Sequence, residues 1–389
     1  MVPVGRSRSI ADFRNLRLVF LVLLAVAKII ATSVRIKPAD LHAHRRSHHS
    51  GTNRFDVSFD HDAPADRLDH RQHGIEEHGG RIDKHESDAA PQPLEAAIVL
   101  APKFSIVTPS FNQRAYIEEA LLSVKNQAYL KVEHIVIDGA STDGTVEVLR
   151  DYASRPGWGH LRWISEPDRG QSDALNKGFR MAVGEIVGWL NSDDRYRSEC
   201  FRAVADAFED NPQADVIYGD YTWIDQRGAV LKVRREIEFS PFVLLYHRVS
   251  PLPTPSSFFR RDIFDDSNFV DVNYHYAMDY EFFLRLAQKG YRFRHAAKIL
   301  ADFRWQPDSK SSKSSGKQFE ERDSIIVRYS PLLRRVPQGS LRSIVLALLR
   351  SQAALLYWSR KLFHGYYFGS ASSQNLIAAT RPTRNSCTP

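Results

Sequence analysis

The stretch IVGWLNSDDRY, at Ile186–Tyr196, joins an apolar run of strand length directly to an acidic loop. Paired aspartates in a loop usually mark no more than a solvated turn, so this stretch alone predicts little. Three further polar clusters precede it, each after another apolar run: TPSFN at Thr108–Asn112, DGASTDGT at Asp138–Thr145 and EPDRGQSDALNKG at Glu166–Gly178. The repetition indicates one crevice built from the ends of several strands.

Apolar runs alternate with helical patterns from about residue 96 onward. Strands are predicted at Phe104–Thr108, Val132–Ile137, Leu161–Ser165 and Ile186–Leu190, and helices over Ala115–Asn126, from Thr142–Thr145 onward, over Asp173–Met181 and near Glu199–Glu209. This alternation is typical of α/β proteins, in which helices flank a mostly parallel sheet. Because parallel strands end at one edge, the polar clusters are expected to converge there.

The motifs of two common nucleotide sites are missing from the sequence. No GxGxxG follows the first predicted strand and no GxxxxGK[ST] occurs, so dinucleotide and P-loop sites are disfavoured. The acidic loop instead suits a hard divalent cation that bridges a diphosphate, with Asp193 supplying a carboxylate and water and phosphate oxygens completing the shell. Mg²⁺ or Mn²⁺ is the expected metal.

Composition limits the function classes that remain. The 389 residues are 43% hydrophobic and can bury one large core with appendages. A net charge of +7 would suit an anionic nucleotide, a membrane surface or nucleic acid. No basic and aromatic stripe supports the nucleic-acid alternative, so no nucleic-acid partner is expected. The two cysteines, Cys200 and Cys387, are too few for a disulfide framework, which favours a reducing compartment such as the cytoplasm.

Five segments are expected from composition. Residues 1–40 hold the apolar run Leu18–Ala27, short for a spanning helix of about 20 residues; it is either a membrane-associated helix or irrelevant to the fold. Residues 41–95 hold nine of the fifteen histidines, which predicts a disordered linker or a misassigned start rather than a metal tract. Residues 96–318 form the main α/β domain, 319–370 a helical C-terminal region, and 371–389 a disordered tail.

From about Lys103 to Lys310 the chain resembles the family 2 inverting glycosyltransferases, which have the GT-A fold. The resemblance rests on the four polar clusters in the expected order. It implies that Asp138 contacts the nucleotide base and that Asn191-Ser192-Asp193 stands for the DxD motif, which binds metal and diphosphate. Asn191 brings no charge to the first position of that motif, so the metal is expected on Asp193 with Asp194 as a helper.

The resemblance also implies a nucleoside-diphosphate sugar as donor, most simply a UDP-sugar. Thr108 and Pro109 would line the base and ribose pocket, largely through their backbone. Asp168 and Arg169 would face the uridine or the diphosphate, unless they form only a turn. Asp173 would contact the nucleotide or, alternatively, favour the amino end of its helix. A second departure is Gly139, which follows Asp138 where many members carry another acid.

The second half is expected to supply the acceptor site and the general base. A helical pattern over His275–Leu286 carries Asp279 and Glu281 near its start. An Asp there commonly caps the helix, but the resemblance implies that Asp279 removes the proton from the acceptor hydroxyl. Further candidates for contact with the acceptor or the diphosphate are Asp220, Arg260, Arg261 and Glu281. Gln306 stands where relatives often carry His.

The region Leu341–Phe363 predicts a basic amphipathic helix that either lies on a membrane or packs on the domain. In the first case the enzyme would be peripheral at the cytosolic face and its acceptor lipid-linked. The expected activity is a hexosyltransferase-type transfer, with inversion, to a saccharide or lipid-linked saccharide in cell-surface polysaccharide synthesis. The alternative is a non-catalytic nucleotide-sugar or carbohydrate binding module on the same fold.

Overall fold

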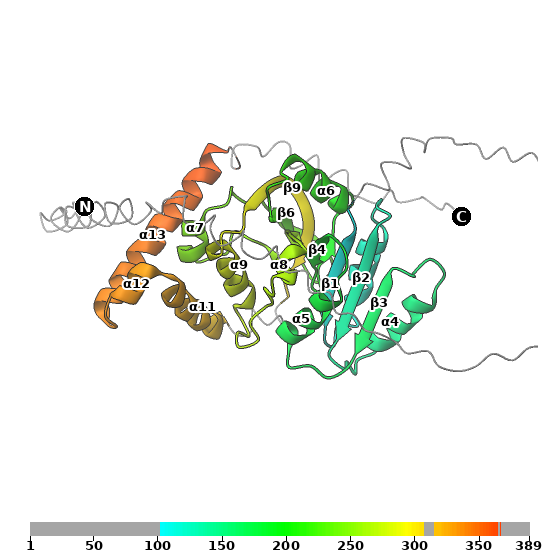
Figure 1. The fold of residues 1–389 in the computed structure, drawn as a ribbon. Coiled ribbons are helices and arrows are strands. Elements are labelled where there is room, and N and C mark those ends of the chain that lie inside the picture. Colours follow the sequence, from blue (N-terminus) through cyan, green and yellow to red (C-terminus); the bar gives the residue numbers. More distant parts are fainter. Residues whose placement is uncertain (1–101, 307–314, 365, 367–389) are drawn as a thin grey trace, which may run out of the picture. The chain divides into compact units, whose positions relative to one another are not determined.

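The computed structural model describes residues 102–306, 315–364 and 366 (Figure 1). The apolar run and the His-rich segment expected within residues 1–95, and the tail expected at 371–389, lie outside the described residues. The same holds for most of a polar Lys/Ser-rich run at Ser309–Lys317. All described residues belong to one compact unit, and helix α11 (Ser315–Tyr329) crosses the domain boundary expected at residue 318.

Within the described residues, nine strands form one sheet in the order β3-β2-β1-β4-β8-β6-β9-β5, with β7 paired to β6. Their bounds are β1 Phe104–Ser110, β2 Val132–Asp138, β3 Leu161–Ser165, β4 Ile186–Trp189, β5 Arg195–Tyr196, β6 Val216–Ile224, β7 Val230–Arg234, β8 Ser257–Arg260 and β9 Phe293–Arg304. Strands β1 to β4, β6 and β9 run in one direction, and β5, β7 and β8 run against them. The predicted mostly parallel α/β sheet is confirmed.

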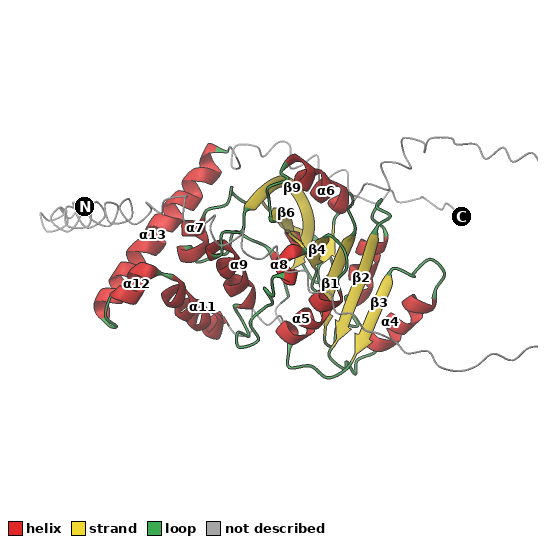
Figure 2. Cartoon of the chain, viewed as in Figure 1, coloured by secondary structure: helices red, strands yellow, loops and turns green. Residues whose placement is uncertain are grey.

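Helices cover both faces of this sheet (Figure 2). They are α3 Ile117–Lys125, α4 Thr145–Ser154, α5 Gln171–Met181, α6 Cys200–Asp210, α7 Pro241–Tyr246, the 3-10 turn η1 Thr254–Ser256, α8 Asp262–Asp265 and α9 Met278–Gln288. Successive side chains of a strand point to opposite faces. Phe104 and Ile106 of β1 accordingly pack with α3 and α6, whereas Val107 meets α5 at Gly178.

Gly178 allows α5 to approach the sheet closely, because a Cβ at this position would lie 2.3 Å from Val107 Cγ1. That spacing is shorter than any real contact, so a larger residue would force the helix outward. The first turn of α5 is thereby held beside the end of β4, where the acidic loop begins.

The predicted C-terminal helical extension is present as α11, α12 (Pro331–Arg335) and α13 (Ser340–Phe363), which gather beside α7 and α9 (Figure 1). Helix α13 buries Leu349, Ala353, Tyr357 and Lys361 at a spacing of four residues. Across the described parts of the chain, every helix falls short of the length and apolarity that crossing a bilayer requires.

A buried histidine in β2 should make stability depend on pH. Burial, with a smaller effect of nearby His160, lowers the pKa of His134 to about 3, and its Nε2 lies 2.9 Å from Thr108 Oγ1. The unfolded chain therefore binds this proton more tightly, and stability should fall as the pH drops from about 6.5 towards 3, by up to about 1.4 kcal/mol per pH unit. In His134→Gln the slope in urea unfolding curves recorded between pH 7 and 5 should become shallower, while burial of His160 and His247, which also lowers their pKa values, keeps a remainder. The exposed His364→Gln should keep the wild-type slope; an unchanged slope in His134→Gln would contradict this account.

Candidate functional site

The carboxyl ends of the parallel strands open into a cavity of about 1230 Å³. Its walls come from the residues after β1, β2, β3 and β4, the segment before η1, the start of α9, the end of β9 and helix α11. These segments are far apart in the sequence, and they meet because the strands that carry them end at one edge of the sheet. The convergence predicted from the four polar clusters is present.

The acidic loop after β4 is fixed by hydrogen bonds from its own neighbours. Asn191 Oδ1 accepts from Trp189 Nε1 at 2.9 Å and from Gln171 Nε2 at 3.0 Å. Its Nδ2 donates to Asp194 Oδ2 at 3.1 Å. The amide that stands at the first position of the expected DxD motif thus lines the cavity but is used to hold the loop.

The two aspartates of this loop differ in accessibility. Asp194 is 2% exposed and its Oδ1 accepts from the backbone N–H of Arg304 at 2.8 Å. Asp193 lines the cavity, and its Oδ2 accepts from Gln306 Nε2 at 2.5 Å. Burial raises the pKa of Asp193, and raises that of Asp194 well above its usual value, where the neighbouring Asp193 charge adds to the effect. Adjacent carboxylates with raised pKa values, one buried and one at the cavity wall, favour a bound cation.

A buried arginine clamps the same loop from the end of β9. The guanidinium of Arg304 donates to the carbonyl of Asp193 at 2.8 Å, to the carbonyls of Asp225 and Gln226 at 3.1 and 3.0 Å, and to Glu119 Oε2 at 2.7 Å. Four acceptors from three separate segments therefore share one fork of donors. No role was predicted for Arg304, and its position two residues before Gln306 was the available signal in the sequence.

A carboxylate from the loop after β3 occupies the space beside Gly139. A Cβ at Gly139 would lie 2.7 Å from Asp168 Oδ2 and 3.3 Å from the ring of Phe111, and all three residues line the cavity. Asp138 itself is fully buried, where it accepts from Ser141 N at 2.9 Å and from Ser165 Oγ at 2.7 Å. The acid that faces the cavity beside Gly139 is thus Asp168.

Asp279 lies on the cavity wall in the first turn of α9. The cap of this helix is Ala277, without a side-chain capping bond. The backbone N–H groups of His275, Tyr276 and Ala277 donate instead to the Glu321 carboxylate of α11, at 3.1, 2.8 and 2.9 Å. Within the helix, Asp279 Oδ1 accepts from the backbone N–H of Tyr280 at 2.8 Å, so one first-turn donor is satisfied by a carboxylate that also lines the cavity.

Several predicted site residues do not line the cavity. Each is bonded within the protein: Thr108 to His134, Arg169 to Asp173, Asp220 to His295 and the backbone of Glu236, and Glu281 to Arg285 and Tyr329. Pro109 does line it. Asp173 lies in the first turn of α5, where a carboxylate favours the amino end of the helix, as the second of its two predicted roles required.

The register of β8 explains why Arg260 and Arg261 are also absent from the cavity. β8 runs antiparallel to β4 and pairs Arg260 with Ile186, the first residue of β4. The end of β8 therefore lies at the amino edge of the parallel strands, opposite the cavity. Arg260 Nε donates there to the carbonyl of Ala214 at 2.8 Å. The segment before β8 faces the cavity instead, with Pro253 and Thr254 in its wall.

Helix α11 adds two residues to the cavity wall that were not among the predicted site residues. Gln318 and Arg322 line the cavity, and Arg322 donates to the carbonyl of His247 at 3.2 Å while its guanidinium lies 4.2 Å from the centre of the Tyr280 ring. No motif in the sequence marks these positions. They reach the site because α11 packs on α9.

Comparison with known proteins identifies the family. Residues 105–267 match the model of glycosyl transferase family 2. An uncharacterized glycosyltransferase of Mycobacterium tuberculosis is 33% identical over 189 residues, which cover 48% of this chain and 70% of that protein. The chain belongs to glycosyl transferase family 2. This family 2 enzyme is also 28% identical over 194 residues to a PGL/p-HBAD biosynthesis glycosyltransferase of Mycobacterium bovis, covering 48% and 70% of the two chains.

A third relative and one solved structure complete the comparison. A putative teichuronic acid biosynthesis glycosyltransferase of Bacillus subtilis is 37% identical over 98 residues, or 25% of this chain and 38% of that protein. The structure of S. aureus TarS 1–349 in complex with UDP-GlcNAc has 18% identity and a TM-score of 0.49, covering 70% of this chain and 77% of that one.

Removing the charge of Glu321 should loosen the entrance of α9. In Glu321→Gln an NH₂ group replaces one of the two carboxylate oxygens that accept the three backbone N–H groups. We expect the free energy of unfolding to fall by about 1 kcal/mol, because part-buried donors lose a charged acceptor. Urea unfolding measures it, with the exposed neighbour Glu320→Gln as the matched control. Equal stability of the two variants would contradict the assigned role.

Proposed function

We propose that this enzyme transfers a sugar from a nucleoside-diphosphate sugar, most simply a UDP-sugar, to a hydroxyl of a saccharide or lipid-linked saccharide, with inversion at the anomeric carbon. The observation that carries the proposal is that Asp193, of the acidic loop, and Asp279, at the start of α9, line the same cavity. Metal-bound diphosphate and an activated acceptor hydroxyl need carboxylates in these two places.

The donor would lie along the strand ends with its base between Phe111 and Asp168. Phe111 is 61% exposed at the cavity and offers an aromatic face, and the Asp168 carboxylate can accept from a base N–H. The ribose and diphosphate would then extend past the end of β4 towards Asp193. We therefore assign base contact to Asp168 and assign Asp138 to holding the loops that carry it.

The acidic loop fits a divalent cation, Mg²⁺ or Mn²⁺, with Asp193 as ligand and Asp194 as its buried support. Among the described residues no group of three or more His, Cys, Asp or Glu could hold a metal alone, so donor oxygens and water would complete the shell. When bound, the cation would offset the charge that develops on the departing diphosphate. Gln306 would keep the Asp193 carboxylate turned towards the cavity through its amide N–H.

Asp279 would act as the general base. The acceptor oxygen attacks the anomeric carbon from the face opposite the diphosphate, the new C–O bond forms as the bond to the diphosphate oxygen breaks, and the hydroxyl proton passes to the Asp279 carboxylate. Arg322 adds a positive charge to the wall of the same cavity. The hydrogen bond from the backbone N–H of Tyr280 to Asp279 Oδ1 would hold this carboxylate in one orientation at the cavity wall.

Relatives named for PGL/p-HBAD and teichuronic acid biosynthesis support a role in making cell-surface glycans. Such a role would place the enzyme on the cytosolic side, where nucleotide sugars are available. The identity of the sugar and the acceptor would follow from the segments before η1 and from α11, which form the remaining walls.

Replacing the base should separate binding from chemistry. Asp279→Asn keeps the size of the side chain but cannot take the proton, so turnover should fall by about 10²–10⁴-fold while donor affinity stays within a few-fold. Transfer assays and calorimetry with the donor measure the two effects. Asp271→Asn, in the loop before α9 and outside the cavity, is the control. Transfer at the wild-type rate by Asp279→Asn would exclude it as the base.

Removing the metal ligand should abolish donor binding that depends on a cation. Titration of UDP-sugars with Mn²⁺ present should give binding in the wild type, which chelation with EDTA removes and which Asp193→Ala lacks. Asp215→Ala, at the opposite edge of the sheet, is the control. Donor binding without any hydrolysis or transfer across a panel of donors and acceptors would instead favour the non-catalytic binding module.

A further inference from the structure

Helix α13 exposes a row of large apolar side chains that Ser351 interrupts near its middle. This apolar stripe consists of Leu341, Ile344, Leu348, Leu355, Trp358 and Leu362, which recur at spacings of three and four residues on either side of Ser351. All except the half-buried Leu348 are between 50% and 72% exposed. Residues at this spacing lie on one side of a helix. An exposed apolar surface of this kind marks a contact with a partner or a lipid phase.

The opposite side of α13 is fixed to the catalytic domain, so the stripe cannot turn inward. Tyr357 stacks on His247 with ring centres 4.3 Å apart and donates to Glu236 Oε2 at 3.1 Å. Lys361 Nζ lies 3.7 Å from the same carboxylate, and Arg360 donates to the carbonyl of Glu238 at 3.2 Å. These contacts involve buried charges, which hold the helix in one rotation.

The charged side chains that follow Asp323 in the sequence are all positive, apart from any histidine. Of the 53 Lys and Arg residues nine follow Asp323, whereas all 46 Asp and Glu residues lie at or before it. The net charge of +7 therefore comes from the last stretch, which contains α12 and α13. Two copies meeting through the stripe would bring two such cationic segments together without an acidic residue from either. An anionic surface is the complementary partner.

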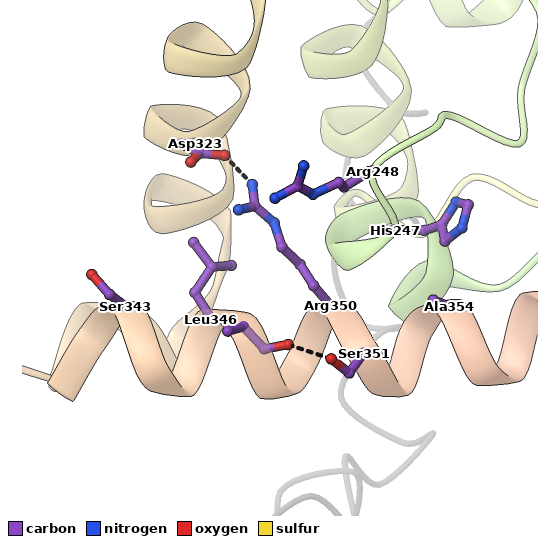
Figure 3. Close-up of a pocket in the computed structure, with 9 residues that line it drawn as sticks. His247, Arg248, Asp323, Ser343, Leu346, Arg350, Ser351 and Ala354 are labelled. Atoms are coloured by element: carbon purple, nitrogen blue, oxygen red, sulfur yellow. Dashed lines mark hydrogen bonds and ion pairs between the residues drawn. The ribbon is translucent and has the colours of Figure 1, made fainter. Parts of the chain in front are cut away.

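A second cavity, of about 520 Å³, lies beside the stripe and is basic (Figure 3). The side chains of Arg248 and Arg350 reach into it, and Ser351 belongs both to its wall and to the row of the stripe. Arg350 pairs with Asp323, and its buried Nε has no hydrogen-bond partner among the described residues. Two guanidinium groups against one carboxylate leave a positive charge that a phosphate would neutralise.

We propose that α13 docks this enzyme on an anionic lipid bilayer, with the apolar stripe at the boundary of headgroups and acyl chains and a lipid phosphate in the Arg248/Arg350 cavity. An exposed apolar stripe with the guanidinium groups of Arg248 and Arg350 beside it has the features that such binding requires. The docking does not depend on the transferase activity. If the proposed function holds, docking on a bilayer would also bring the enzyme to a lipid-linked acceptor.

The two cavities share two segments of the chain, which links docking to the site. Arg322 lines the candidate active site while its neighbour Asp323 lines the basic cavity, and His247–Arg248 line the basic cavity while Val249–Ser250 line the site. Headgroups at the basic cavity would therefore lie next to the wall of the candidate active site. A saccharide carried on a lipid would enter from that side.

Flotation of the full chain with vesicles tests the proposal. Binding to phosphatidylcholine vesicles that contain phosphatidylglycerol should exceed binding to phosphatidylcholine alone and should weaken with salt. Ile344→Gln/Leu355→Gln, which keeps good helix formers, should weaken it at least about tenfold. Arg248→Gln should weaken it about fivefold. Leu130→Gln/Leu231→Gln, which alters equally exposed leucines elsewhere, should bind like the wild type.

Two outcomes would overturn the proposal. If Ile344→Gln/Leu355→Gln binds vesicles as the wild type does, another segment such as the apolar run Leu18–Ala27 carries the binding. If the wild type ignores anionic vesicles but forms a dimer that this variant breaks, a second copy covers the stripe. Metal-dependent hydrolysis of a soluble donor, measured in parallel, should be unchanged in the variant. If the wild type shows no such hydrolysis, that result counts against the proposed function and leaves the vesicle result intact.

Discussion

The buried guanidinium of Arg304 is the interaction on which the candidate site depends. It joins the carbonyl of Asp193, the turn after β6 and the Glu119 carboxylate of α3, while its own backbone N–H holds Asp194. Adjacent carboxylates repel each other, and a loop that carries them needs rigid support to stay folded towards a cavity. A guanidinium in which all three nitrogens are hydrogen-bonded supplies that support, because leaving a buried N–H unpaired would be costly.

The second constraint acts through the C-terminal helices. Glu321 accepts three backbone N–H groups at the entrance of α9, and Arg322 beside it lines the cavity. Helix α11 thus completes the site rather than merely extending the domain. The buried contacts of α13 with Glu236 and His247 then fix α13 on the same body. The basic, apolar surface and the candidate active site consequently keep one relative orientation, which a lipid-linked acceptor would require.

The sequence specified most of the fold because each element carried its own pattern. The strands at Phe104–Ser110, Val132–Asp138 and Leu161–Ser165, and the helices between them, follow from apolar spacing and turn residues that act locally. The convergence of Asp168 and Asp193 followed from parallel topology, since strands of one direction must end at one edge, whereas Asp279 in the first turn of α9 was expected only from the family resemblance. Leu341–Phe363 was likewise recognisable as an amphipathic helix, and the question left open was what covers its two faces.

What the sequence by itself determined, then, was the order of strands and helices and the set of polar loops at one edge. Only the tertiary structure decided which polar side chain in each loop faces the cavity. Asp138 accepts hydrogen bonds from nearby serines and Asp173 from Arg169, so neither faces the cavity. Arg260 lies at the opposite edge of the sheet because β8 is antiparallel. The site also depends on side chains from distant segments, namely Arg304, Glu321 and Arg322. The physical reason is that a buried polar group must find its partner in space, and partners contributed by distant elements leave no local pattern along the chain.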